Sequence, residues 1–423
     1  FSRAFKKSVG FSPSEYKITI SRSNRQIRLI HLLAVLIPRI SFSFHSRLFL
    51  FHRTKTSTLL LLKCVAFSQK VSYFAIPNTD LKMKHLLFVR SLLLIGALLL
   101  TQNTLGIQSR FYGAGQLSSS LITTLHQDDK GYIWIGTEYG LNKFDGLHFI
   151  EYLHNEHDSL SIMSNGIRSL NSDREGNLWV GFQTGLQRYD AGSDTFHRVT
   201  FEGTGYTPNV SAIKQLSSGE IWLIVSRLGI FTLNPEQMTA RPLSRVTELC
   251  DTDHINHFHE DSHKRIWIAT EERGIYCIEN DFTRVTHYAL TNTAKDPATL
   301  VETNRNGMII AAGGGKIFVF NEIERRFEQL RVPQNLYLDT YDLLQRPGGD
   351  FIVATFRNGL WRINEEKKAL EEYAVSFPNE LNIRNANTVK LMEDSEGNLW
   401  CGCFQRGIVM IPSAPATFDV WDF

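Results

Sequence analysis

One short pattern recurs seven times in this chain, and it restricts the fold more than any other feature. Four copies are complete: DDKGYIWIGTEYGLNKFD from Asp128, DREGNLWVGFQTGLQRYD from Asp173, DSHKRIWIATEERGIYCIEN from Asp261 and DSEGNLWCGCFQRGIVMIP from Asp394. Degenerate copies start at Ser217, Arg305 and Pro347. The position of the central tryptophan, which is isoleucine in two copies, recurs every 42 to 48 residues. This spacing predicts an all-β chain, a seven-bladed β-propeller of four-stranded antiparallel blades over residues 107–423.

The residue types within each copy fit that prediction. The D-x-x-G step is typical of a tight turn, in which Asp binds backbone amides and Gly takes a positive φ. The following strand alternates so that its Trp is expected between neighbouring blades. The outer strand of the last blade is expected either near Phe418 or around Arg110–Tyr112. The residues assigned to the structural repeat are Asp128, Gly131, Trp134, Asp173, Gly176, Trp179, Trp222, Asp261, Trp267, Asp394, Gly397 and Trp400.

The first quarter of the chain has a different character. Residues 83–106, MKHLLFVRSLLLIGALLLTQNTLG, have a basic start, a short apolar run and small residues near a cut site, which predicts a signal peptide beginning at Met83. Residues 16–79 contain no Asp or Glu, and residues 11–95 contain no Gly. We interpret residues 18–82 as translated intergenic sequence, a non-native extension that is unstructured or helical. A transmembrane hairpin and an organellar transit peptide are the alternatives.

Charge separates these regions further. Residues 107–423 carry 29 Lys and Arg against 41 Asp and Glu, so the near-neutral total of the whole chain comes from its basic first quarter. An acidic exported part argues against general binding of nucleic acid or anionic lipid. Its hydropathy pattern contains no membrane span. The cysteines of this part, whose disulfide status the sequence leaves open, are Cys250, Cys277, Cys401 and Cys403.

The repeat resembles that of two-component regulator propellers, whose pattern is D-x-x-G-x-[IL]-W-[IV]-G-T-x-x-G-L-x-[RK]-[FY]-[DN]; the copy from Asp128 matches it throughout and the other complete copies match it in part. Residues 117–152 also resemble the opening blade of such sensors, and residues 154–170 resemble the connection into their second blade. Residues 1–17, FSRAFKKSVGFSPSEYK, are similar to the end of an AraC-family helix-turn-helix. That remnant is too short to fold or bind DNA alone.

The resemblance implies a periplasmic sensor of a Bacteroidetes hybrid two-component system that recognises an oligosaccharide or polysaccharide fragment. A second propeller, a membrane span, a histidine kinase, a receiver and an AraC-type domain belong to such parents, and none is found in this sequence. The chain is therefore expected to bind rather than catalyse, without cofactor or metal. A homodimer stays open. The alternatives are a propeller enzyme, such as a polysaccharide lyase or hydrolase, and a truncated scaffold without activity of its own.

Ligand contacts are expected on the connections between the second and third strands of each blade, which gather at one end of a propeller. Arginine is suited to uronate or sulfate groups, and a tyrosine can stack on a sugar. The alternative is that these are ordinary polar turn residues. The candidates are Tyr139, Gln183, Arg227, Glu272, Arg273, Arg357, Asn358, Gln405 and Arg406.

The stretch HINHFHEDSHKR, residues 254–265, contains four histidines, of which His257 and His259 share one strand face. Zinc is conceivable, but spacing places no carboxylate or cysteine beside them, and solvated or edge positions are the expected setting. No catalytic order of Ser, His and Asp and no phosphate loop stands out. A base beside clustered carboxylates would favour an enzyme.

Overall fold

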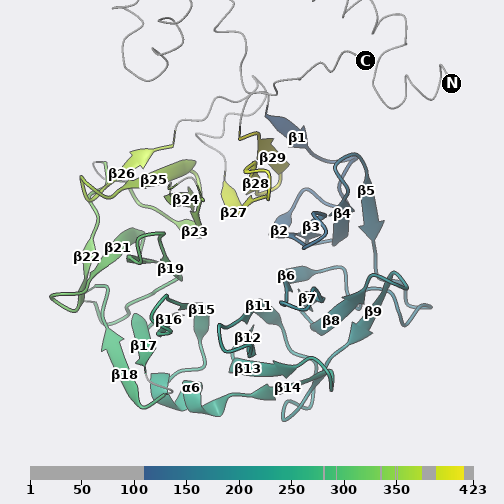
Figure 1. Cartoon of the computed structure of the whole chain (residues 1–423), viewed down its shortest axis with the longest axis horizontal. Helices are drawn as coiled ribbons and strands as arrows, with labels where there is room; N and C mark the ends of the chain where they lie inside the picture. Colours follow the sequence, from purple (N-terminus) through teal and green to yellow (C-terminus); the bar gives the residue numbers. More distant parts are fainter. Residues whose placement is uncertain are drawn as a thin grey trace, which may run out of the picture. The chain divides into compact units, whose positions relative to one another are not determined.

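The strands form seven sheets arranged around a central axis (Figure 1). The computed structural model describes residues 109–279, 282–291, 293–333, 336–347, 349, 351–373 and 387–413. The predictions made for residues 1–17, 18–82 and 83–106 fall outside this part of the chain. Within the described residues, the seven-bladed propeller predicted from the repeat is confirmed.

The first three blades follow one another along the chain. Blade 1 contains β2 (Ile122–Gln127), β3 (Ile133–Thr137), β4 (Gly140–Phe144) and β5 (Phe149–Tyr152). Blade 2 contains β6 (Ile167–Ser172), β7 (Leu178–Phe182), β8 (Gly185–Asp190) and β9 (Thr195–Arg198). Blade 3 contains β11 (Val210–Gln215), β12 (Ile221–Val225), β13 (Gly229–Asn234), β14 (Thr239–Pro242) and β10 (Thr200–Phe201).

The remaining four blades repeat the same order. Blade 4 contains β15 (Ile255–Glu260), β16 (Ile266–Thr270), β17 (Ile275–Glu279) and β18 (Arg284–Tyr288). Blade 5 contains β19 (Leu300–Thr303), β20 (Ile309–Gly313), β21 (Lys316–Asn321) and β22 (Arg326–Gln329). Blade 6 contains β23 (Thr340–Gln345), β24 (Phe351–Thr355), β25 (Leu360–Asn364) and β26 (Ala369–Glu372). Blade 7 contains β27 (Thr388–Glu393), β28 (Leu399–Cys403), β29 (Gly407–Ile411) and β1 (Arg110–Tyr112).

Strand β1 closes the ring. It pairs antiparallel with β29, with Phe111 opposite Val409, and so supplies the outer strand of blade 7 from the other end of the repeat array. Of the two expected closures, the one around Arg110–Tyr112 is therefore present. The other, near Phe418, falls outside the described residues.

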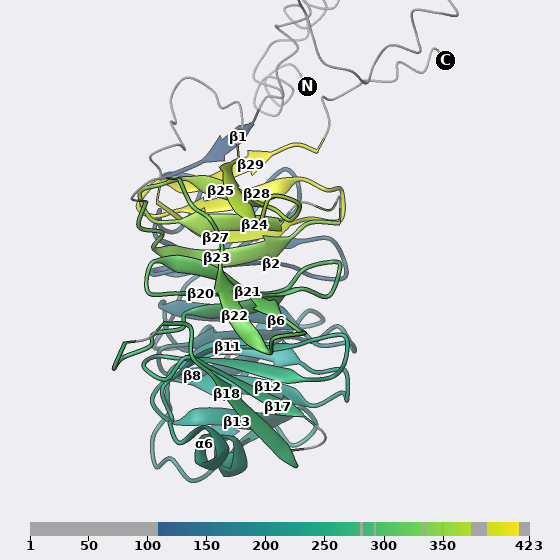
Figure 2. The same ribbon diagram turned by 90° about the vertical axis from the view of Figure 1, so that its left-hand side faces the viewer.

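Two features of blade 3 depart from the expected pattern. Strand β10 pairs parallel with β14, so this sheet has five strands rather than four. The helix α6 (Ser244–Cys250) follows β14 at the periphery of the ring (Figures 1 and 2). Its buried Val246 and Cys250 pack against the interface between blades 3 and 4. Among the helices of the described chain, none is long and apolar enough to span a membrane.

The D-x-x-G step forms the turn between the first and second strands of a blade, which we call the box turn. In blade 1, Asp128 Oδ1 accepts from the backbone N–H of Tyr132 at 2.9 Å, and its Oδ2 accepts from Trp134 Nε1 at 2.8 Å. Gly131 has a φ of 86°, which glycine adopts without steric cost. The same Asp–Trp hydrogen bond, at 2.8 Å, occurs in blades 2, 4 and 7.

The core is divided into seven apolar layers, one between each pair of adjacent blades. The repeat's tryptophan belongs to the layer shared with the next blade, as predicted: Trp134 packs with Phe182 of blade 2, and Trp400 packs with Ile135 of blade 1. Because each layer is bounded by two neighbouring sheets, the blades do not share one central core.

The seven first strands face the axis and run in the same sense, so the ring has two distinct ends, seen edge-on in Figure 2. One end carries the box turns, and we call it the turn face. The opposite end carries the connections between second and third strands, and we call it the loop face. Six of the first strands contain a β-bulge close to the loop face, which turns one extra side chain toward that end.

Candidate functional site

All nine residues predicted to contact a ligand lie on the loop face, contributed by six blades. They form several local groups rather than one cluster. Arg227, Gln405 and Arg406 are exposed. Arg227 and Gln405 lie in tight turns and have positive φ angles, of 61° and 60°. Tyr139 is also exposed, and its backbone N–H donates to Thr137 Oγ1 at 3.0 Å.

Blades 1 and 2 are connected on this face by an arginine that sequence reasoning missed. Arg168, the bulged residue of β6, donates from Nη1 to Glu138 Oε1 at 2.8 Å. With the amide of Gln183 oriented to satisfy both groups, its side-chain oxygen accepts from Arg168 Nε at 3.2 Å. Gln183 is therefore held against its own blade's first strand, in a chain of hydrogen bonds that crosses to blade 1.

The charges predicted on blade 4 are compensated by local partners. Arg273 Nη1 lies 2.7 Å from Asp251 Oδ2, and Glu272 accepts a hydrogen bond from Lys295. This hydrogen bond and the charge of Lys295 hold the pKa of Glu272 below its ordinary value. The positive charge of Arg273 is thus neutralised locally, since this arginine has its own counter-ion.

Blades 6 and 7 bring together three aromatic rings that the sequence analysis did not select. Phe356 stacks on Tyr341 with ring centroids 5.6 Å apart and meets Phe404 edge-on at 6.1 Å. Tyr341 is 46% exposed and Phe404 is 39% exposed. We call Tyr341, Phe356 and Phe404 the aromatic platform. Partly exposed aromatic rings offer apolar faces on which a sugar ring or another planar group can stack.

The surroundings of the aromatic platform are ordered by hydrogen bonds. The guanidinium carbon of Arg357 lies 5.4 Å from the Phe356 ring centre, a cation–π contact. Arg357 donates its backbone N–H to Asn387 Oδ1 at 2.9 Å, and Asn358 Nδ2 donates to the carbonyl of Tyr337 at 2.9 Å. Two of the nine predicted residues, Arg357 and Asn358, therefore border the platform.

A signal for the platform was present in the repeat. The first residue after the second strand is Glu138, Gln183, Ser226, Glu271, Gly314, Phe356 or Phe404 in blades 1 to 7, respectively. Aromatic residues occupy this position only in two consecutive copies. A residue-by-residue comparison of the loops, rather than a search for polar side chains, would have found Phe356 and Phe404.

The histidines of β15 lie on the inner edge strand of the blade 4 sheet, an edge setting as expected, and both side chains are partly exposed. His257 and His259 lie on the strand that faces the axis, and both approach Glu302 of β19. His259 Nδ1 is 2.6 Å from Glu302 Oε2. Spacing could not reveal this carboxylate because it comes from the next blade. In the described residues, no group of three or more His, Cys, Asp and Glu side chains could hold a metal ion.

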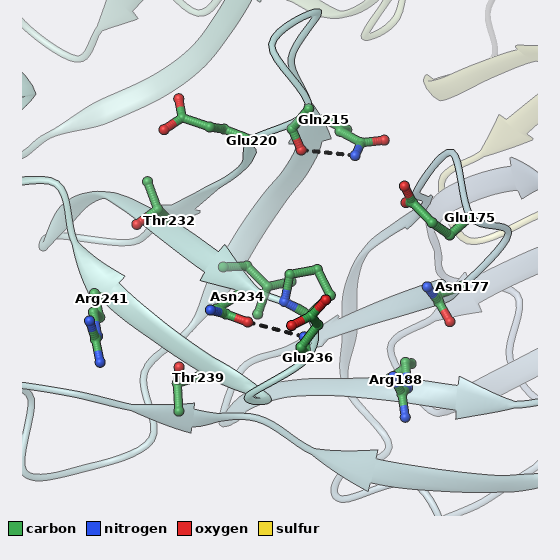
Figure 3. A pocket seen from close by; sticks show the side chains of 13 residues that line it. Glu175, Asn177, Arg188, Gln215, Glu220, Thr232, Asn234, Glu236, Thr239 and Arg241 are labelled. Carbon is green, nitrogen blue, oxygen red and sulfur yellow. Dashed lines mark hydrogen bonds between the residues drawn. The ribbon is translucent and has the colours of Figure 1, made fainter.

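Two grooves lie on the turn face, away from these groups. One of about 600 Å³ opens between blades 2 and 3 and is lined by Arg188, Glu220 and Glu236 among others (Figure 3). Another, of about 640 Å³, opens between blades 4 and 5 beside Arg265 and Arg305. Because such grooves recur where box turns of adjacent blades diverge, we attribute them to the repeat architecture.

Comparison with known proteins agrees with the resemblance predicted from the repeat. Residues 116–139, which include the first part of the first complete copy, match the family model described as two component regulator propeller. Histidine kinase P4 of Formosa agariphila is 43% identical over 61 residues, which are 14% of this chain and 4% of that kinase.

Solved structures share the fold at low sequence identity. The extracellular domain of BT3049 from B. thetaiotaomicron, assigned to a hybrid two component system, aligns with a TM-score of 0.64 and 22% identity over 75% of this chain and 43% of that domain. Virginiamycin B lyase from Staphylococcus aureus aligns with a TM-score of 0.57 and 14% identity over 73% of this chain and 99% of the lyase. The chain thus spans less than half of the sensor domain and all but 1% of the enzyme's length.

Proposed function

We propose that this propeller is an extracytoplasmic ligand-sensing domain of a hybrid two-component sensor, periplasmic in location, that recognises an oligosaccharide or polysaccharide fragment on its loop face. In the parent protein, the signal would pass through further extracytoplasmic segments to a histidine kinase. Support comes from the match to the two component regulator propeller model and from the shared fold with the BT3049 extracellular domain.

The aromatic platform is the observation that carries the ligand class. Tyr341, Phe356 and Phe404 are partly exposed on one face, although a large aromatic side chain gains free energy by burial. Stacked rings bordered by Arg357 and Asn358 combine an apolar surface with hydrogen-bond donors. This combination suits a sugar, which has apolar ring faces and hydroxyl groups at its edges.

A thermal-shift screen tests the proposal. The purified protein would be scanned with arabinohexaose, galactohexaose, xylohexaose, mannohexaose and glycosaminoglycan hexasaccharides. A ligand that binds the folded state raises the melting temperature. A free ligand concentration of about 100 times the Kd adds about 2.7 kcal/mol to the free energy of unfolding. The variant Phe404→Ser is expected to lose the shift. Phe111→Ser is the matched control, because Phe111 is comparably exposed but lies on the outer strand β1.

A propeller enzyme is the second candidate. The specific observation in its favour is the pair of histidines beside Glu302 on the inner strands, together with a fold shared with virginiamycin B lyase. Chromatography of the same incubations distinguishes the two. Release of shorter or unsaturated products would overturn the sensor proposal, whereas stabilisation with unchanged saccharide supports it. A well-folded sample without any shift would favour the scaffold reading.

A further inference from the structure

Charged side chains line the inner strands of blades 3 to 7, in contrast to blades 1 and 2. At the equivalent positions, β2 and β6 carry Thr124, Ser169 and Asn171 beside one histidine. We call the charged group the channel cluster. Its members are Lys214, His257, His259, Glu302, Asp342 and Lys390.

Glu302 contacts three other members of the channel cluster. Its Oε1 lies 3.6 Å from Lys214 Nζ and 3.7 Å from His257 Nε2, and its Oε2 lies 2.6 Å from His259 Nδ1. His259 Nε2 is also 2.7 Å from Thr303 Oγ1. Three consecutive blades are therefore joined across their inner strands.

The pair nearest the loop face is Lys390 and Asp342. Lys390 Nζ donates to Asp342 Oδ1 at 3.1 Å, and the Leu391 backbone N–H donates to Asp342 Oδ2 at 2.8 Å. Asp342 follows Tyr341 of the aromatic platform directly, across the β-bulge of β23. The platform and the channel cluster are thus adjacent parts of one surface, leading from the loop face toward the axis.

Three of these side chains are partly accessible although they lie on the innermost strands, whereas Asp342 is buried beneath Lys390. Lys214 is 36% exposed, Lys390 33% and Glu302 25%. The outer strands of each blade cover the inner strands from outside, so the exposed fraction faces the axis. A charged side chain at such a position retains hydrogen-bonding capacity for water or for a ligand, because its protein partners use only part of it.

The cluster carries charges of both signs. Two ammonium groups, of Lys214 and Lys390, face two carboxyl groups, of Glu302 and Asp342. Burial opposes ionisation of Glu302, but the charges of Lys214 and His259 outweigh it and place the pKa of Glu302 below its ordinary value. Burial lowers the pKa of His257 to about 4, so this imidazole is neutral at pH 7. A net negative ligand would meet carboxylates as well as ammonium groups, whereas hydroxyl groups can both donate to the carboxylates and accept from the lysines.

We propose that the channel cluster binds the hydroxyl groups of the terminal sugar of a neutral saccharide chain, while the neighbouring ring stacks on the aromatic platform. This inference rests on the proposed function and deepens it. Seven blades enclose the axis, so the interior of a polymer cannot reach the cluster from the side, and only a chain end can enter. The sensor therefore responds to the ends released by degradation rather than to the intact polymer.

Calorimetry with paired probes tests the end-on mode without any substitution. Arabinohexaose, galactohexaose, xylohexaose and mannohexaose would each be titrated beside arabinan, galactan, xylan and mannan at equal mass. A hexasaccharide that binds should saturate the protein, while its polymer of ~100 residues or more should bind at least about tenfold more weakly by mass because it has fewer ends. Equal binding by mass would overturn the end-on mode, and absence of binding by all eight probes would contradict the proposed function as well.

A charge-removing variant tests the role of the cluster. Asp342→Asn with Lys390→Gln keeps two side chains of similar shape that can hydrogen-bond to one another. The expected result is a melting temperature within a few degrees of the parent and a loss of at least about tenfold in affinity for the hexasaccharide that binds. Glu371→Gln with Lys367→Gln, which removes an ion pair at the outer strand β26 of blade 6, is the matched control and should retain the affinity. If the double variant folds and binds like the parent, the channel cluster is a structural network only and the inference is wrong.

Discussion

The two ends of the ring use the same repeat in opposite ways. On the turn face, the aspartates of four box turns bind their own backbone and the tryptophan of the second strand. Adjacent box turns also bind one another: Ser395 donates its N–H to Gln127, and Arg174 donates its N–H to Gln215. On the loop face, by contrast, the first residue after the second strand differs between blades: it is Glu138 in blade 1 and Phe404 in blade 7.

This difference separates stability from recognition. On the turn face, polar groups are satisfied within the protein, so substitution there leaves buried donors or acceptors without partners. On the loop face, Tyr341, Phe404 and Arg227 extend into solvent, so substitution costs little folding free energy. The following predictions test this separation, in order of decreasing effect on stability.

The largest effect is expected for Asp173→Ala on the turn face. Asp173 accepts from Trp179 Nε1 at 2.8 Å and from the Asn177 backbone N–H at 2.8 Å, and both donors lose a charged acceptor in the variant. We expect the free energy of unfolding to fall by about 3 kcal/mol, measured by urea denaturation. Glu175→Ala, which removes an exposed acid of the same box turn, is the control. A change below about 1 kcal/mol for Asp173→Ala would contradict the assignment of stability to the turn face.

The inner strands that join the two faces should make stability depend on pH. His257, surrounded by Lys214, His259, Glu302 and Lys390, has its pKa lowered by burial to about 4. Between about pH 6.5 and 4, this histidine is protonated in the unfolded chain but neutral in the folded chain. The free energy of unfolding therefore falls as the pH is lowered through this range. The pKa of Glu302 is lowered too, so its contribution is present above its unfolded value of 4.5 and is lost as the pH falls below that value.

Substitution of this histidine isolates its share of the pH dependence. The variant His257→Gln should reduce the fall in unfolding free energy between pH 7 and 4.5 by about 1–2 kcal/mol. His148→Gln is a control, because His148 is exposed on a turn-face loop. Denaturation at the two pH values measures the difference, and parallel curves for the parent and His257→Gln would exclude His257 as the cause.

A smaller effect is expected when blades with and without the aspartate are compared. In blade 3, Leu216 stands six residues before Trp222, where the box turns of blades 1, 2, 4 and 7 have Asp. Within the described residues, the buried Trp222 Nε1 has no hydrogen-bond partner. Trp→Phe removes similar volume in both settings, but only Trp179 loses a hydrogen bond. We expect Trp179→Phe to cost about 1 kcal/mol more than Trp222→Phe by thermal denaturation. Equal costs would show that the Asp–Trp bond contributes nothing net.

The repeat predicted what is local and periodic. Spacing placed Trp134 between blades, and the D-x-x-G step predicted the turn of Asp128 and Gly131, because both follow from a few consecutive residues. The helix α6 and the parallel pairing of β10 were not predicted, since they occur once and belong to connections between repeats.

The candidate site was predicted only in position. Topology alone places every second connection at one end, so the nine residues were correctly expected on the loop face. The partners of these and neighbouring side chains could not be predicted, because they come from other elements of the fold. Asp251 neutralises Arg273, and Glu302 contacts His259. The contact of Phe356 with Phe404 likewise depends on how blades 6 and 7 pack.

The smallest effect is expected for Arg227→Gly on the loop face. Arg227 is exposed and adopts a φ of 61°, a conformation that glycine enters without the steric cost paid by other residues. Glycine also gives the unfolded chain more freedom, which opposes that gain. The two contributions nearly cancel, so we expect unfolding free energy to stay within about 0.5 kcal/mol of the parent in urea denaturation. A loss above about 1.5 kcal/mol would place Arg227 in the stabilising network and would end the distinction between the two faces at blade 3.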